Sequence, residues 1–293
     1  MNRTVRKARK AIRVVALLLP VLALVSLLFG AGPYDLRLEV STNQAIPGED
    51  RRIEYISPAV TNRTGEILFL GWLADTTDWP ARFGLFLKQA GALQKVIADG
   101  DPLPDGVGNC DLSSSNFPLF DLNENGALLV VIPSQGILIR ESSELKWAVR
   151  RGAAIQGTSL TVGTVGHYPF TYRERPIKPF LGNNGQVAFQ ARLSDASSAV
   201  LLSSKTGIIP LVMAGAPIPG RTTAFGSDHQ MNQVRVKGDA VTFDLGGESG
   251  TTTTVGIFQY SGGALRTVAL VGDQIPQIGT IKAIWEFESN SDG

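Results

Sequence analysis

Short runs in which apolar and polar residues alternate recur along most of this chain, and each run begins or ends at a turn sequence. One turn sequence is Asn-x-x-Gly ahead of an apolar run, found as Asn62 to Gly65 before 67–70 and Asn123 to Gly126 before 128–131, with Asn183-Asn184-Gly185 in the same place before 187–189. Asn and Gly tolerate positive φ at low cost, which suits both residues to such turns. A fourth run, Val241 to Leu245, follows Lys237 to Asp239 instead. The pattern predicts β-strands joined by tight turns.

A second turn sequence, Gly-(Asp/Ala)-x-(Ile/Leu)-Pro, follows a further apolar run. Its copies are Gly100 to Pro104, Gly215 to Pro219 and Gly272 to Pro276, with a decayed copy at Gly152 to Gln156 and an incomplete one at Asn43 to Gly48. Together the two turn series mark a unit of roughly fifty to sixty residues that is written four times. Each unit holds about four short strands, and the only convincing helix pattern is at the N-terminus.

A four-stranded antiparallel unit cannot bury both of its faces alone, so neighbouring units must stack. Radial stacking gives a propeller, and the sequence therefore predicts an all-β, propeller-like array within residues 33–293. Stacked sandwiches and a β-solenoid are the alternatives. The approximate unit ranges are 50–106, 107–157, 176–220 and 231–279. Residues 280–293 are expected either to begin a further unit or to close the ring as a last strand. In the first case the given sequence is a fragment of a longer chain.

The first 32 residues have a different pattern. An almost wholly apolar stretch runs from Val14 to Ala31 and is preceded by six basic residues: Arg3, Arg6, Lys7, Arg9, Lys10 and Arg13. A basic flank before an apolar segment indicates an export signal that leaves the rest of the chain outside. Cleavage after Ala31 is disfavoured because Phe29 stands two places earlier. Residues 1–32 are therefore either a signal peptide or an apolar helix that anchors an extracytoplasmic chain in the membrane.

Charge separates the leader from the remainder of the chain. The whole sequence carries 27 basic and 26 acidic residues, and without the six leader residues 21 basic residues face 26 acidic ones, a net charge of −5. This balance argues against nucleic acid as a partner. Cys110 is the single cysteine and cannot form an internal disulfide. A partly buried, inert thiol is the expected state, and a surface thiol or an intermolecular bridge is the alternative.

Catalytic and metal-binding patterns are weak. His167 and His229 lie in no metal-ligand spacing, and Ser249 lacks the spacing of a nucleophile elbow. No cofactor is expected, except that one loop with three carboxylates could hold Ca²⁺: Asp99, Asp101 and Asp105. The alternative is that these residues are simply good turn formers, because two of the equivalent turns carry alanine, Ala153 and Ala216, in place of Asp101.

Aromatic residues in two insertions are the candidate ligand-binding groups. Trp72 and Trp79 flank residues 74–78, and Tyr168 and Tyr172 lie in the long insertion from Thr158 to Pro179. Exposed rings beside Asp and Arg suit sugar rings or peptide side chains. The alternative is that these rings cover the edge of a sheet.

The later repeats carry a family resemblance. Asn183 to Leu193, Gly256 to Phe258, Gly263 to Ala269 and Gly272 to Pro276 resemble tandem repeats in uncharacterised exported bacterial proteins, some of which have C-terminal surface-sorting segments. The resemblance covers residues 40 to 290 or so and implies a propeller-like extracytoplasmic protein. It supplies no catalytic residue, and no C-terminal anchor follows in this sequence.

Two classes of function remain. The first is a binding or scaffolding module of the cell envelope, with an envelope protein or glycan as partner and the membrane contacted through the N-terminal segment. The second is a propeller-type hydrolase or lyase acting on polysaccharide or another extracellular substrate through carboxylates in a central channel, for which Asp75, Asp78 and Asp228 are candidates. Titratable groups that converge on the channel would favour the second class.

Overall fold

A computed structural model describes residues 40–42, 44–46, 51–74, 82–106, 108–112, 119–132, 135–165, 178–227, 229–246, 254–284 and 287. The chain divides into two units, residues 1–41 and 42–293, and every strand below belongs to the second. The predicted N-terminal helix lies outside the described residues. Within the described ranges, no helix has the length and apolar character that a membrane crossing requires.

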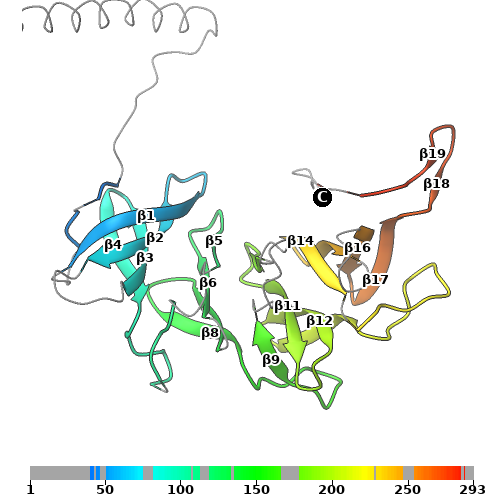
Figure 1. The fold of residues 1–293 in the computed structure, drawn as a ribbon, viewed down its shortest axis with the longest axis horizontal. Coiled ribbons are helices and arrows are strands. Elements are labelled where there is room, and N and C mark those ends of the chain that lie inside the picture. The colour runs from blue at the N-terminus through cyan, green and yellow to red at the C-terminus, as the bar shows by residue number, and fades with distance from the viewer. Residues whose placement is uncertain are drawn as a thin grey trace, which may run out of the picture. The chain divides into compact units, whose positions relative to one another are not determined.

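Four antiparallel sheets follow one another along the described part of the chain, each a meander of successive strands (Figure 1). Sheet 1 contains β1 (Arg52–Thr61), β2 (Ile67–Ala74), β3 (Arg82–Gln89) and β4 (Ala92–Ala98). Sheet 2 contains β5 (Phe120–Leu122), β6 (Leu128–Ile132), β7 (Gly136–Arg140) and β8 (Leu145–Arg150). Sheet 3 contains β10 (Phe180–Leu181), β11 (Val187–Leu193), β12 (Ser198–Ser204) and β13 (Gly207–Met213), and β9 (Val162–Val165) also pairs with β11. Sheet 4 contains β14 (Gln230–Lys237), β15 (Ala240–Gly246), β16 (Thr254–Ser261) and β17 (Ala264–Leu270). The predicted all-β, propeller-like class of tandem four-stranded units is confirmed.

Each sheet packs on the next through a separate apolar core, because alternate side chains of a strand point to opposite faces. On β6, Leu128 and Val130 join the core shared with sheet 1, whereas Leu129 and Val131 join the core shared with sheet 3. A third core joins sheets 3 and 4 and includes Phe243. Since both faces of sheets 2 and 3 are buried, their central strands are almost continuously apolar.

The Gly-(Asp/Ala)-x-(Ile/Leu)-Pro sequences form short hairpins between the sheets, which we call linker hairpins. In each, the first glycine donates its backbone N–H to a carbonyl at the hairpin's far end, as from Gly100 to Cys110 (2.9 Å) and from Gly215 to Phe225 (2.8 Å). The decayed copy keeps the bond from Gly152 to Val162 (2.7 Å). The incomplete copy before β1 keeps the isolated bridge of the hairpin, between Ala45 and Arg52. The strands β18 (Gln274–Ile275) and β19 (Gly279–Thr280) are the last copy.

In the three linker hairpins that connect two sheets, the apolar residue is buried in the core between those sheets. Leu103 lies between sheets 1 and 2, Ile155 between sheets 2 and 3, and Ile218 between sheets 3 and 4. Ile155 also pairs with Ile208 on the last strand of the following sheet. The hairpins therefore fix neighbouring sheets to one another as well as connecting them.

Cys110 occupies a position of the linker hairpin that otherwise holds an apolar residue. The equivalent residues are Ile53, Val162 and Phe225, and all four side chains are buried. The predicted inert thiol agrees with this position. Burial, reinforced by the negative charges of Asp99, Asp101 and Asp111, raises the pKa of the Cys110 thiol far above its ordinary value.

We expect the Cys110 thiol to be unreactive toward a disulfide reagent at pH 8 in the folded protein and to react fully in denaturant, because the thiolate is the reacting species. Ionisation of this thiol also makes the stability of the fold depend on pH. The unfolded chain ionises its thiol near pH 8.5 or so while the folded chain does not, so this contribution to stability is lost as the pH rises further. Absorbance after mixing with the reagent, with and without guanidinium, measures the reactivity. Stoichiometric labelling of the folded protein within seconds would contradict the burial.

Candidate functional site

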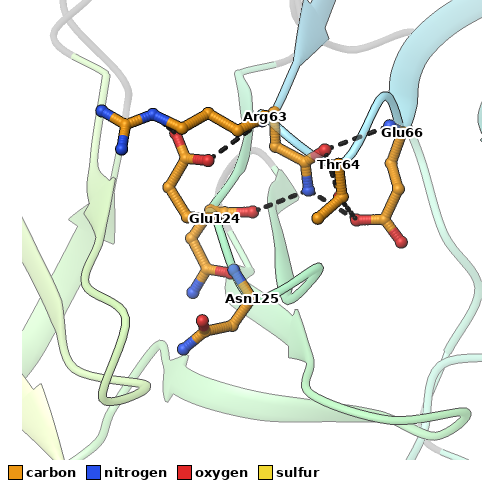
Figure 2. A network of polar contacts seen from close by, with 7 residues as sticks. Arg63, Thr64, Glu66, Glu124 and Asn125 are labelled. Atoms are coloured by element: carbon orange, nitrogen blue, oxygen red, sulfur yellow. Dashed lines mark hydrogen bonds and ion pairs between the residues drawn. The ribbon is translucent and has the colours of Figure 1, made fainter.

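A buried polar network connects the turn between β1 and β2 to the equivalent turn of sheet 2 (Figure 2). The Asn62 Nδ2 atom donates to the Glu66 carboxylate and to the backbone oxygen of Asn123 (3.1 Å). The Asn62 Oδ1 atom accepts the backbone N–H of Glu66 (3.0 Å), and the N–H of Arg63 donates to Glu124 (3.0 Å). We call this the inter-sheet latch, since a side chain of one turn binds the backbone of the next.

The latch is repeated along the array with substitutions. Asn123, equivalent to Asn62, donates from Nδ2 to the backbone oxygen of Gly182 in the turn of sheet 3 (3.0 Å). In sheet 3 the equivalent position is Gly182, which has no side chain to donate. There Asn184 takes over and donates to the backbone oxygen of Gly238 (2.8 Å). The Asn residues therefore stabilise neighbouring turns, and in these three turns the residues with positive φ are the glycines Gly65, Gly126 and Gly185 (φ 80°, 77° and 78°).

A buried carboxylate lies within the latch. Glu66 is buried beside Gly126, where a Cβ atom would come within 2.8 Å of its Oε2 atom, and it accepts a hydrogen bond from Gln89. Burial lowers the pKa of Arg140, and the negative charge of Glu66 acts in the opposite direction. These groups hold sheets 1 and 2 together, so we assign them to the architecture of the protein.

A second repeat position lies on the first strands of the sheets, two residues before the turn position of Asn62. This repeat position holds Val60, Asp121, Phe180 and Arg235 in sheets 1 to 4. With Lys178 we call Asp121, Phe180 and Arg235 the first-strand row. Its residues make contacts between sheets 2 and 3 and between sheets 3 and 4.

Asp121 connects sheet 2 to sheet 3. Its Oδ1 atom lies 2.6 Å from the Nζ of Lys178, and its Oδ2 atom accepts the backbone N–H of Leu181 (3.4 Å). The Asp121 side chain is 13% exposed and that of Lys178 is 41% exposed. The ammonium group is therefore open to solvent beside a carboxylate that is nearly buried.

Arg235 connects sheet 4 to sheet 3. Its guanidinium carbon lies 5.6 Å from the ring centroid of Phe180, and its Nη1 atom donates to the backbone oxygen of Val234 (2.9 Å). A guanidinium group over a ring is an attractive contact, and its remaining donors suit carboxylate, phosphate or hydroxyl acceptors. The row thus places two cations, one ring and one carboxylate along neighbouring sheets.

Among the predicted ligand-binding aromatics, the structure places Trp72. It lies on β2 between Tyr55 and Phe83, with ring centroids 5.6 and 5.3 Å away in edge-to-face geometry. This packing agrees with the interpretation that the ring covers part of a sheet. Trp79, Tyr168 and Tyr172 lie outside the described residues, as do His167, Ser249 and the candidate channel carboxylates Asp75, Asp78 and Asp228.

The three carboxylates of the predicted calcium loop have different protein partners. Asp99 accepts the backbone N–H of Phe83 (2.8 Å), and Asp101 accepts that of Ala98 (2.9 Å) and pairs with Lys95 (3.1 Å). Asp105 forms an ion pair with Arg150. In the described part of the chain no three His, Cys, Asp or Glu side chains are grouped to hold a metal ion. The calcium site stays a prediction, and these partners compete with a cation for the carboxylates.

His229 is packed and hydrogen-bonded at the junction of two sheets. Its side chain is buried, its Nδ1 atom lies 2.8 Å from the backbone oxygen of Gly226, and its ring contacts Phe225. Its backbone oxygen accepts a hydrogen bond from Gln190 (2.6 Å), which fixes the start of β14 to sheet 3. The residue therefore takes part in the junction of sheets 3 and 4.

Sequence reasoning missed the first-strand row. Part of the signal was available, because Asp121 and Phe180 both stand five residues before the glycine of their turns, Gly126 and Gly185, and neighbouring copies of a repeat lie side by side. Arg235 precedes a shorter turn, so only the strand pairing places it in the series. What the sequence does not show is that Lys178, which follows a long insertion, returns to pair with Asp121.

The fold and the row together define a propeller-like repeat protein with a polar surface on its first strands. The chain belongs to a family of unknown function, DUF7453, whose profile matches residues 27–291. A solved structure with some similarity is an α-L-arabinanase from Penicillium chrysogenum complexed with arabinobiose, at 11% identity and a TM-score of 0.34 over 77% of this chain and 67% of that one. A comparison with curated proteins finds no match.

Proposed function

We propose that this protein is an extracytoplasmic binding or scaffolding module of the cell envelope, displayed from the membrane by residues 1–32 or secreted after their cleavage. The ligand is a polar envelope component, a glycan or a protein segment. The observation that supports binding is the first-strand row, in which one repeat position carries a different chemistry in each successive sheet while the structure keeps the copies in contact.

The row suits a ligand with both acidic and hydroxyl groups. The exposed ammonium of Lys178 and the guanidinium of Arg235 would attract a carboxylate, and the Phe180 ring would pack against the apolar face of a sugar or side chain. The rigid sheets hold these groups in place because the linker hairpins and the latch fix each sheet to the next. Preorganised groups bind without an added cost of ordering.

We expect the full chain to co-sediment with envelope polysaccharide or peptidoglycan isolated from its source cell, and Arg235→Ala to weaken this binding about tenfold. Removing one partly exposed cation from a binding surface costs on the order of 1.4 kcal/mol, which is that factor. Arg266→Ala is the matched control, because Arg266 is an exposed arginine on β17 that bonds Gln259 within its own sheet. Equal binding by wild type and Arg235→Ala would contradict a role for the row.

Two further experiments test the hydrolase alternative and the location of the chain in the cell. Release of soluble sugar from the polysaccharide, abolished by Asp121→Asn, would favour the hydrolase. Protease treatment of intact cells tests the outward placement, since residues 33–293 should be digested while cytoplasmic proteins survive. Protection of the chain in intact cells would refute the envelope proposal.

A further inference from the structure

The latch between sheets 3 and 4 is built differently from the two before it. The donors of the first two latches are buried asparagines followed by residues with long side chains: Asn62 before Arg63, and Asn123 before Glu124. In the third latch the donor is Asn184, which is exposed and is followed by Gly185. Asparagine before glycine is the pair most prone to spontaneous deamidation, because no side chain hinders the glycine nitrogen. The third latch therefore depends on a chemically labile carboxamide.

The missing side chain at Gly182 also releases a backbone donor. In sheet 2 the Oδ1 atom of Asn123 accepts the backbone N–H of Ala127 (2.9 Å). The equivalent N–H in sheet 3 belongs to Gln186, and it donates to the Oδ1 atom of Asn184 instead (3.2 Å). A donor on this oxygen stabilises the negative charge that develops there when a nucleophile attacks the Cγ atom. The substitution that makes Asn184 the latch donor thus also activates its carboxamide.

Sheet 2 contains an Asn-Gly pair that lacks this activation. Asn125 precedes Gly126 at the equivalent place in the turn and is also exposed. Its Nδ2 atom donates to the backbone oxygen of Asn183 (2.9 Å), but within the described ranges its Oδ1 atom accepts no hydrogen bond. The molecule therefore carries two Asn-Gly pairs in equivalent turns, which differ in the donor to the carboxamide oxygen.

We propose that Asn184 is a site of spontaneous deamidation that opens the latch between sheets 3 and 4. The backbone nitrogen of Gly185 loses its proton to a solvent base and attacks the Cγ atom of Asn184, and the Nδ2 atom leaves as ammonia. Water then opens the resulting cyclic succinimide at either carbonyl, which leaves aspartate or isoaspartate at this position. No oxidant or reductant is consumed. The inference does not depend on the binding function proposed above.

Deamidation would replace an attractive contact with a repulsive one. The Nδ2 atom of Asn184 donates to the backbone oxygen of Gly238 (2.8 Å) and to the Oε1 atom of Gln186 (3.0 Å). A carboxylate would instead place an acceptor oxygen against these two acceptors. The Oε1 atom of Glu141 lies where a Cβ atom on Gly185 would be, so a second negative charge is close by. The modified turn then no longer holds the turn of sheet 4.

Incubation of the full chain in detergent at mildly alkaline pH tests the reaction, with tandem mass spectrometry of its peptides as the readout. In the folded protein Asn184 should deamidate at least about fivefold faster than Asn125, the factor that one hydrogen bond of ordinary net strength supplies. In guanidinium the N–H of Gln186 no longer makes this bond, and the two rates should become similar. Equal rates in the folded protein, or the same preference for Asn184 in guanidinium, would overturn the proposal.

Hydrogen exchange tests the effect on the latch. Asn184→Asp should raise the exchange rates of the backbone N–H groups in residues 182–186 and 236–240 at least about fivefold. Wild type after incubation should show the same increase in proportion to its deamidated fraction. Asn125→Asp is the matched control and should leave residues 236–240 unchanged, because the latch of sheet 2 keeps its buried donor Asn123. Circular dichroism confirms that both variants fold, and unchanged exchange in Asn184→Asp would refute the opening of the latch.

Discussion

Replacing Asn123 with alanine should lower the free energy of unfolding by about 3 kcal/mol, because the Asn123 side chain makes three hydrogen bonds, two of them buried, that alanine cannot replace. Its Nδ2 atom donates to the backbone oxygen of Gly182 (3.0 Å). Its Oδ1 atom accepts the backbone N–H groups of Asn125 (3.0 Å) and Ala127 (2.9 Å). The loss would leave the buried backbone N–H of Ala127 without this partner and would remove the bond from sheet 2 to the Gly182 oxygen of sheet 3.

Denaturant unfolding followed by tryptophan fluorescence measures this change. Asn183→Ala is the matched control, because Asn183 lies in the same turn of sheet 3 and is exposed, and in the described part of the chain its side chain makes no hydrogen bond. The control should change stability by less than about 0.5 kcal/mol. If both variants lost the same small amount, the latch would not hold the sheets together.

The two series of turn sequences were the main basis for predicting the fold, but the conformation that we expected for asparagine in them was wrong. We expected Asn and Gly to share the positive φ of each turn, yet Gly65, Gly126 and Gly185 alone have it (φ 80°, 77° and 78°). Asn62 and Asn123 are instead hydrogen-bond donors to the next turn. Strand alternation is a local property and can be identified in a sequence, whereas a bond that spans 61 residues, as between Asn62 and Asn123, depends on the stacking of the sheets.

The linker hairpins show how well sequence similarity alone identifies the copies of the repeat. The copy at Gly152 has lost both its Asp and its proline, yet it keeps the hairpin because the retained bonds are between backbone groups. Ile155 is retained, and its side chain is buried in the core between sheets 2 and 3. Cys110 could not be recognised as a member of the hairpin's apolar position from its identity, since only the pairing of the chain aligns it with Val162 and Phe225.

The candidate site illustrates a different limit. Aromatic residues in insertions were the natural candidates from the sequence because loops often carry function, but Trp72 is packed between two rings of its own sheet. The first-strand row was overlooked because Asp121, Phe180 and Arg235 are unlike one another, and a search for repeats favours what is the same. The position is recognised only once the sheets are stacked, because the strand pairing then aligns residues of different chemistry.

Replacing Gly136 with alanine should be the most damaging single substitution of those considered, with a loss of about 4 kcal/mol in the free energy of unfolding. Gly136 opens β7 with φ 148°, a conformation that an L-residue adopts at a cost of about 1–3 kcal/mol. A Cβ atom would also lie 2.1 Å from the backbone oxygen of Val149, so β8 would have to move. That movement would disturb Val149, which belongs to the core between sheets 2 and 3.

Gly91→Ala separates the two causes. Gly91 has φ 81° in the turn between β3 and β4, but no atom lies within 4 Å of the Cβ position, so this variant carries the backbone strain without the overlap. We expect it to lose about 1 kcal/mol. Both variants are compared with wild type by denaturant unfolding under identical conditions. A loss at Gly136 no larger than the loss at Gly91 would show that β8 moves away freely, and the core between sheets 2 and 3 would then contribute less to the rigidity of the array than its burial implies.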